Sequence, residues 1–294
     1  MTQNQMISSS ANVPSNVNVP SSTIVGPFCV LGENVVLGEN VVLGVGCVLG
    51  VGVKVGAGSE LGNYVSIGTG SELGLRTRIG DHTTIYPQVQ LGDDGFIGSN
   101  SSLGRLPKAA ATSTVKAHAD LPPLRMGNGF TVGCSAVLYA GTSYADEAFV
   151  GDGAVVRERC SIGQNVVIGS GVGVENDTKI GAFTKIQTGS YITAYMEIEE
   201  RVFIAPMVTT TNDNFMGRTE KRFQAIKGPT IQRGARIGGG AILLPGVKVA
   251  PETFVAAGAL VTKDTVARRI VKGFPAKEVG DVAEEELLPC YLKP

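Results

Sequence analysis

Residues 35–62 read VVLGENVVLGVGCVLGVGVKVGAGSELG, and a Leu or Val followed by Gly returns at every sixth position of this stretch. The residue two places before each of them is small or β-branched, as at Val41, Cys47 and Ser59. An α-helix repeats every 3.6 residues and a strand every two, so neither explains a period of six. Such a period is typical of a parallel β-helix, in which three short strands make one coil and equivalent side chains stack.

The same hexad extends outward from this stretch in three runs. Together they hold 32 hexads, which at three hexads per coil predicts ten to eleven coils. The leading aliphatic residue is expected to fill a corner of a narrow triangular core, and the small fifth residue is expected to point inward. The aliphatic residues that lead the hexads extend over Val25 to Ile97, Met126 to Ile204, and Ile231 to Val255.

The register predicts an all-β chain with one long domain. We expect a flexible leader over 1–22, a hexapeptide-repeat β-helix over 23–266, and a C-terminal cap and tail over 267–294. Two loop excursions, 103–125 and 210–230, interrupt the repeat. The leader has no Lys or Arg and no apolar core, so it does not resemble a signal peptide.

Composition narrows the possible partners. The net charge is −1, and the basic residues are scattered along the 294 residues, so neither nucleic acid nor an anionic membrane surface is an expected partner. No apolar stretch approaches the roughly 18–20 residues that cross a bilayer. The five cysteines are dispersed and odd in number, which favours the reducing cytoplasm. Three of them are expected to act as small buried hydrophobes, Cys29, Cys47 and Cys160.

The two excursions are the predicted location of binding chemistry. Long loops in a regular solenoid are usually functional or disordered. The first is polar and basic and carries His118, whose neutral imidazole is a candidate general base because it lies outside the packed register. The second begins with Asn212 and Asp213, an amide that can orient an acceptor and a carboxylate that can take a proton. A turn built from Asx side chains is the alternative for this pair.

Other polar residues are expected to be structural. His82 falls at a turn position that should face solvent. Glu158 and Glu175 occupy hexad positions that are normally polar and outward, so a solvated face is the expectation for both. No residues have the spacing of a metal site, so no metal is expected.

The hexads and the segments 236–247, 254–264 and 273–277 together resemble the hexapeptide-repeat acyltransferases closely, over roughly residues 25–280. The resemblance implies a left-handed β-helix, a homotrimer and an acyl-CoA, most simply acetyl-CoA, in a groove between neighbouring shafts. It also implies small residues along the coenzyme and lysines near its phosphates, here Gly239, Ala241, Ala256, Ala257, Gly258, Lys263, Lys272 and Lys277.

Within that family the chain looks like the sugar-nucleotide N-acetyltransferases that acetylate an amino sugar. The resemblance implies that Asn212 lies at the active site. Those relatives tend to carry a Glu where this chain has Ala194 and Tyr195. Residues 91–96 are also similar to the N-acyltransferases of lipid A biosynthesis, but their catalytic His has no counterpart at a matching position. The N-acetyltransferase likeness rests on 185–187, 202–206 and 211–213.

The leading hypothesis is therefore an acetyl-CoA-dependent acetyltransferase acting on small molecules, with a nucleotide-linked amino sugar as acceptor. Its amine can attack the thioester directly, and holding both reactants in attack geometry can be worth about 7–11 kcal/mol. An O-acetyltransferase on a sugar or serine-like hydroxyl is an alternative that needs a stronger base. A zinc carbonic anhydrase needs three histidines, whereas the chain has two. A non-enzymatic scaffold or an ice-binding solenoid is a further alternative. The two polar excursions argue against it, because neither would have a role there.

Overall fold

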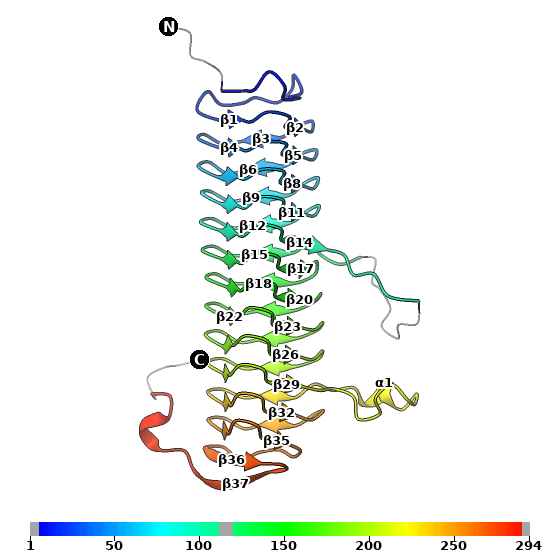
Figure 1. Ribbon diagram of the computed structural model, residues 1–294, viewed down its shortest axis with the longest axis vertical. Coiled ribbons are helices and arrows are strands. Elements are labelled where there is room, and N and C mark those ends of the chain that lie inside the picture. Colours follow the sequence, from blue (N-terminus) through cyan, green and yellow to red (C-terminus); the bar gives the residue numbers. More distant parts are fainter. Residues whose placement is uncertain (1–5, 112–119, 290–294) are drawn as a thin grey trace. The chain divides into compact units, whose positions relative to one another are not determined.

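The computed structural model describes residues 6–111 and 120–289, and the chain divides into two compact units, Met1–Gly153 and Ala154–Pro294. Each unit is a stack of coils, and each coil contributes one short strand to each of three parallel sheets (Figure 1). We call these sheets the A, B and C faces in the order in which the chain visits them. The predicted class, an all-β parallel β-helix, is confirmed.

The first unit contains β1 to β19. Its A face holds β1 (Ile24–Val25), β4 (Val42–Leu43), β7 (Glu60–Leu61), β10 (Arg78–Ile79), β13 (Phe96–Ile97), β16 (Thr131–Val132) and β19 (Phe149–Val150). Its B face holds β2 (Val30–Leu31), β5 (Val48–Leu49), β8 (Ser66–Ile67), β11 (Thr84–Ile85), β14 (Ser102–Arg105) and β17 (Val137–Tyr139). Its C face holds β3 (Val36–Leu37), β6 (Lys54–Val55), β9 (Glu72–Leu73), β12 (Gln90–Leu91), β15 (Arg125–Met126) and β18 (Ser143–Tyr144).

The second unit contains β20 to β37. Its A face holds β22 (Val167–Ile168), β25 (Lys185–Ile186), β28 (Phe203–Ile204), β31 (Arg236–Ile237), β34 (Phe254–Val255), β36 (Arg269–Gly273) and β37 (Ala276–Asp281). Its B face holds β20 (Val155–Val156), β23 (Gly173–Val174), β26 (Tyr191–Ile192), β29 (Thr209–Thr210), β32 (Ile242–Leu243) and β35 (Leu260–Val261). Its C face holds β21 (Ser161–Ile162), β24 (Lys179–Ile180), β27 (Glu197–Ile198), β30 (Thr230–Ile231) and β33 (Lys248–Val249).

The core follows the hexad. The leading aliphatic residue is the second residue of each two-residue strand, and it is buried, as with Leu43 and Ile186 at 1% and 0% exposure. The small fifth residue also points inward, and Cys29 and Cys47 are buried there as expected. Where this residue is a hydroxyl it links adjacent coils: the Thr184 hydroxyl donates to the Glu199 carbonyl over 2.8 Å and accepts the Val202 N–H over 3.1 Å. Buried polar groups are thereby satisfied.

The number of coils exceeds the predicted ten to eleven. Within the residues described, the A face contributes seven parallel strands to the first unit and six to the second, so about thirteen coils are present. The sequence count was too low because it left out coil positions beside the breaks. Leu103, Thr210 and Val261 are buried in the same register although they lie at the ends of the uninterrupted runs.

Part of the predicted leader also joins the stack. Ile7 and Asn12 form parallel bridges to Val25 and Val30, and Val17 is buried at 9% exposure. The segment around Ile7 to Val17 thus lies against the first coil, and the flexibility of the leader stays a prediction. This segment lacks the Leu-Gly pairs of the hexad, which is why the register did not reveal it.

Both excursions leave their unit at the same kind of corner, the one between the B and C faces (Figure 1). The first follows β14 and returns at β15. The second carries a short helix, α1 (Arg222–Ala225). The Lys227 N–H donates to the Asn212 carbonyl over 3.0 Å, and the Lys227 carbonyl accepts the Gly246 N–H over 2.9 Å. Residues 213–226 are thus an insertion within a single corner.

The second unit ends in a cap. β36 pairs in parallel with β34, and β37 folds back antiparallel onto β36. A 3₁₀ turn, η1 (Glu284–Glu286), follows. Among the described residues, no helix is long and apolar enough to cross a membrane.

Candidate functional site

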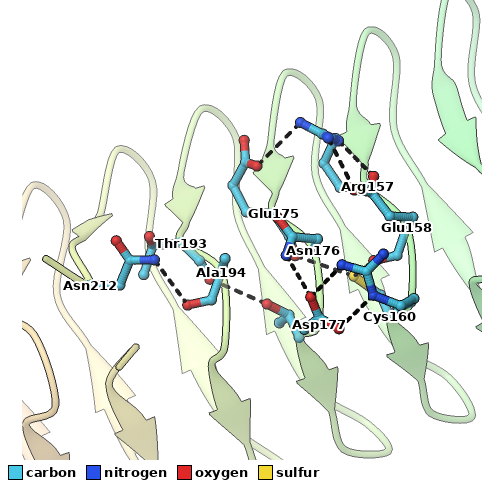
Figure 2. Close-up of polar contacts among 11 residues, drawn as sticks. Arg157, Glu158, Cys160, Glu175, Asn176, Asp177, Thr193, Ala194 and Asn212 are labelled. Atoms are coloured by element: carbon cyan, nitrogen blue, oxygen red, sulfur yellow. Dashed lines mark hydrogen bonds and ion pairs between the residues drawn. The ribbon is translucent and has the colours of Figure 1, made fainter. Parts of the chain in front are cut away.

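A column of polar residues lies along the B–C corner of the second unit (Figure 2). One coil is 18 residues long here, because β20, β23, β26 and β29 pair in succession at that interval. Corner residues 18 apart in the sequence therefore stack on one another. In this corner the residue after the leading aliphatic is not Gly. We call the four stacked tripeptides the corner column; they are Arg157–Arg159, Glu175–Asp177, Thr193–Tyr195 and Thr211–Asp213.

A buried carboxylate begins the column. Glu158 is 2% exposed and accepts two hydrogen bonds from the Arg157 guanidinium, from Nε over 2.9 Å and from Nη2 over 3.1 Å. Nη1 of Arg157 lies 3.6 Å from a carboxylate oxygen of Glu175. The expectation of a solvated face is therefore wrong for Glu158, because its corner is covered by the stacked coils. Glu175 is partly exposed at 28% of its side chain.

A second ion pair lies on the other side of the column. Arg159 donates from Nε and Nη2 to the two carboxylate oxygens of Asp177, both over 2.7 Å. The hydrogen bonds that Arg159 donates to Asp177 raise the pKa of Arg159 above its ordinary value. Asn176 is 4% exposed, and its amide donates to Asp177 over 2.5 Å. Figure 2 shows Asp177 pointing away from the side on which Glu175 and Arg157 meet.

Tyr191, on the outer side of β26, joins the column to the B face. Burial raises the pKa of its hydroxyl, and the negative charge of Glu175 and a hydrogen bond to it raise that pKa further. The Tyr191 phenol therefore lies close to the Glu175 carboxylate. The Thr193 side chain, on the corner that follows β26, also lies near the Tyr191 hydroxyl.

Asn212 completes the column. Its amide nitrogen lies 3.4 Å from the Ala194 carbonyl, a long hydrogen bond across one coil. Ala194 itself has no polar side chain to reach the Asn212 amide. Asn212 is half-buried at the base of the second excursion. The amide is therefore held through its nitrogen, and the role of Asn212 at an active site stays a prediction.

Asp213 is placed to anchor the excursion. One oxygen accepts the Phe215 N–H over 2.8 Å, the other accepts the Gly217 N–H over 2.9 Å, and Arg222 lies 3.0 Å away. Burial raises the pKa of Asp213, but the two N–H donors and Arg222 outweigh it and hold that pKa below the usual range. These contacts match the Asx turn that the sequence left open. A carboxylate so engaged is a weak proton acceptor.

The two histidines lie apart from this column. His82 is exposed at its turn, as expected, and stacks on Tyr64 with ring centroids 5.2 Å apart. His118 lies outside the described residues, so its role as a base stays a prediction.

Most of the predicted coenzyme residues gather at the corner between the A and B faces. The Gly258 N–H donates to the Gly239 carbonyl over 2.9 Å, so these two turns stack. The turns at Gly240 and Gly258 have φ of +66° and +69°, and a Cβ at either would meet nothing within 4 Å, so this edge is small and open. The Ala256 N–H donates to the Val271 carbonyl over 2.9 Å, which brings Lys272 and its hairpin neighbour Lys277 beside this corner.

Two predicted coenzyme residues lie elsewhere. Ala241 is fully buried in the core. Lys263 follows β35 and is exposed at the B–C corner, on the side of Asn212. The three lysines are therefore split between two corners. Across the described residues, no group of three or more His, Cys, Asp and Glu side chains is arranged to hold a metal ion.

Reasoning from the sequence missed Arg157, Glu158, Asn176 and Asp177 as a site. The signal was present in two forms. Arg157 and Glu175 stand where the hexads of the first run have Gly in every case but one. A comparison at 18 residues aligns Glu158 and Asn176 with Asn212.

Known proteins were compared with the chain, and no family model matches it. It is similar to a putative serine acetyltransferase of Schizosaccharomyces pombe, 37% identical over 87 residues, which are 30% of this chain and 32% of that protein. It is also similar to serine acetyltransferase of Buchnera aphidicola, 34% identical over 99 residues, 34% of each chain. The chain thus spans about a third of the length of these curated relatives.

Solved structures give a looser likeness. A variant of perosamine N-acetyltransferase from Caulobacter crescentus, in complex with CoA and GDP-perosamine, is 25% identical over 46% of this chain and 57% of that one, with a TM-score of 0.40. Arabidopsis UDP-N-acetylglucosamine acyltransferase is 18% identical over 87% of this chain and 73% of that one, also with a TM-score of 0.40.

Proposed function

We propose that the protein is an acyl-CoA-dependent acyltransferase that acetylates the amino group of a nucleotide-linked amino sugar. The observation that carries the proposal is the corner column, where Asn212 and a set of carboxylates and guanidiniums interrupt an otherwise plain solenoid. Acetyl-CoA is the donor, and the open A–B corner around Gly239 and Gly258 accommodates its pantetheine arm. The free cysteines among the described residues fit a cytoplasmic location.

The names of the curated relatives support acetyl transfer. Both are serine acetyltransferases, and each matches this chain over about a third of its own length. The resemblance of 236–247 and 254–264 to hexapeptide-repeat acyltransferases points to the same chemistry. The likeness of 211–213 to the sugar-nucleotide N-acetyltransferases favours an amine as the acceptor.

The proposed reaction needs no nucleophile from the protein. The acceptor nitrogen attacks the thioester carbon, the new N–C bond forms, and the C–S bond breaks to release coenzyme A. The protein contributes by holding both reactants in attack geometry. Asn212 orients the amine through its amide oxygen, and a backbone N–H at a corner stabilises the oxyanion, a contribution of about 3 kcal/mol.

O-acetylation of serine is the second candidate, because both curated relatives carry that name. A hydroxyl is a poorer nucleophile and requires a base such as imidazole. The sequence from Ala154 onward has no histidine, so His118 is the residue that would have to supply it. The carboxylates of the corner column suit an amine better.

The proposal is tested by acceptor specificity. Purified protein with acetyl-CoA is incubated with UDP-, dTDP- and GDP-linked amino sugars and separately with L-serine, and released thiol is measured. Thiol release with an amino-sugar nucleotide and not with L-serine is the expected result. Release with L-serine alone would replace the leading proposal by the second candidate, and release with neither acceptor class would contradict both.

Lys272 and Lys277 are expected to contact the phosphates of coenzyme A. Reversing both charges (Lys272→Glu with Lys277→Glu) removes charge-assisted contacts and should raise the Kd about tenfold. The effect should shrink at high salt, since exposed charges are screened. Calorimetric titration with coenzyme A measures it, with the exposed C-face variant Lys248→Glu as the control and Lys263→Glu as the test of the other corner. An unchanged Kd in the double variant would place the donor elsewhere.

The enzyme is proposed to be a homotrimer. The outward residues of the B face in the second unit are all uncharged, whereas those of the A and C faces include lysines, Arg236 and Glu197. A second copy of the chain is the occupant that suits this face. Light scattering should give three times 30.5 kDa, and Ile242→Glu with Leu260→Glu should lower that mass while Lys248→Glu does not. A monomeric wild type would remove the intersubunit site. The uncharged outward residues are Val155, Gly173, Tyr191, Thr209, Ile242 and Leu260.

A further inference from the structure

The corner column contains four carboxylates. Asp213 pairs with Arg222 in the second excursion, and the other three differ in their surroundings. Both oxygens of Glu158 are taken by Arg157, and the side chain is buried. Both oxygens of Asp177 are taken by Arg159, and Asn176 adds a further donor. Within the described part of the chain, Glu175 has a 3.6 Å contact to Arg157 and lies near the Tyr191 phenol. Its oxygens are therefore less fully engaged by close donors than those of Glu158 and Asp177.

We infer that Glu175 binds the acceptor amine and takes its proton during transfer, and that Arg157, held by Glu158, positions the Glu175 carboxylate. This inference rests on the proposed function, because it assumes that the column receives the acceptor. Glu175 and Asn212 lie on the same corner two coils apart, roughly 9–10 Å at the usual spacing of strands. A sugar ring with its substituents bridges that distance.

The charges of the column select a cation. Two guanidiniums, Arg157 and Arg159, face three carboxylates, which leaves one negative charge for the acceptor ammonium to balance. The same excess negative charge would repel an anionic acceptor group. The charged and titratable groups next to Glu175 are Arg157, with Glu158 paired to it, and Tyr191. The Arg159–Asp177 pair and Tyr195 lie on the other side of the column.

The proton balance suits a carboxylate. The acceptor binds as an ammonium, and Glu175 takes one of its protons as the nitrogen attacks the thioester carbon. Once the N–C bond has formed, the C–S bond breaks, a remaining N–H proton passes to the departing thiolate, and Glu175 releases its proton to solvent. The overall change is ammonium plus acetyl thioester giving amide, thiol and one proton to solvent. A hydroxyl acceptor stays too weakly acidic for this base.

The test compares Glu175→Gln with the wild type in the thiol-release assay over a range of pH. The loss of a general base should lower kcat by about 10²–10⁴-fold near pH 7. The deficit should shrink as the pH rises toward the pKa of the acceptor amine, because the free amine then needs no help. Glu175→Asp should retain part of the activity, and the exposed C-face variant Glu197→Gln is the matched control.

The positioning role has its own readout. Arg157→Lys keeps the charge but not the paired contacts to Glu158, so it should lower kcat while KM for acetyl-CoA stays within twofold, roughly the scatter of such measurements. A Glu175→Gln variant with wild-type kcat and an unchanged pH profile overturns the inference, and the proposed function still stands if the wild type transfers acetyl. A wild type that transfers to no amine overturns the proposed function itself.

Discussion

The Asn212→Ala variant is expected to transfer acetyl groups about 100-fold more slowly than the wild type, the cost of misplacing a reactant by about 1 Å. The Asn212 amide nitrogen is tethered to the Ala194 carbonyl, and in the proposed reaction its oxygen orients the acceptor amine. Alanine removes that oxygen and leaves the corner backbone unchanged. Thiol release at saturating acetyl-CoA and acceptor measures the loss in kcat.

Asn214→Ala is the matched control, because this neighbouring amide is exposed on the excursion. It should behave like the wild type. His118→Ala separates the remaining possibilities: a loss of about 10²–10⁴-fold in kcat with little change in KM would make His118 the base. With Glu175 as the base, that variant stays near the wild type. Full activity in both Asn212→Ala and His118→Ala would show that the acceptor lies elsewhere.

The fold was predictable because its cause is periodic. One buried aliphatic residue and one small inward residue per hexad specify three strands per coil, and the buried rows at Leu43 and Ile186 match that expectation. Coils at the ends of the runs were missed where the pattern loses its Gly, as at Thr210, and where residues 6–22 stack without any Leu-Gly pair.

The site was only partly predictable. Asn212 came from a family resemblance, and its contact with Ala194 agrees with a held amide. The hexad separates inward from outward residues but does not say which outward residues share a corner, so Glu158 was taken for a solvated side chain. Its burial is a consequence of stacking at 18 residues, a longer period than the one that reveals the fold. The geometry of 213–226 has no period at all and depends on Asp213 and Arg222.

Arg157→Met is expected to destabilise the second unit by about 3–5 kcal/mol, because it leaves the buried Glu158 carboxylate without its partner. The wild-type pair is bidentate, and Glu158 is 2% exposed. The midpoint of urea unfolding measures the change. Replacing both members, Arg157→Met with Glu158→Leu, should restore most of the stability, since no buried charge remains.

The Arg76–Asp94 pair in the first unit is the control for geometry. It has the same bidentate form, with hydrogen bonds of 2.6 and 2.7 Å, but its side chains are 56% and 55% exposed. Arg76→Met should therefore leave the urea midpoint almost unchanged, because water solvates Asp94 once its partner is gone. If Arg157→Met is as mild as Arg76→Met, Glu158 is not an anion confined to the corner. Its role in holding Arg157 against Glu175 would then lose its physical basis, because a carboxylate that water or a proton can neutralise does not fix the guanidinium in place.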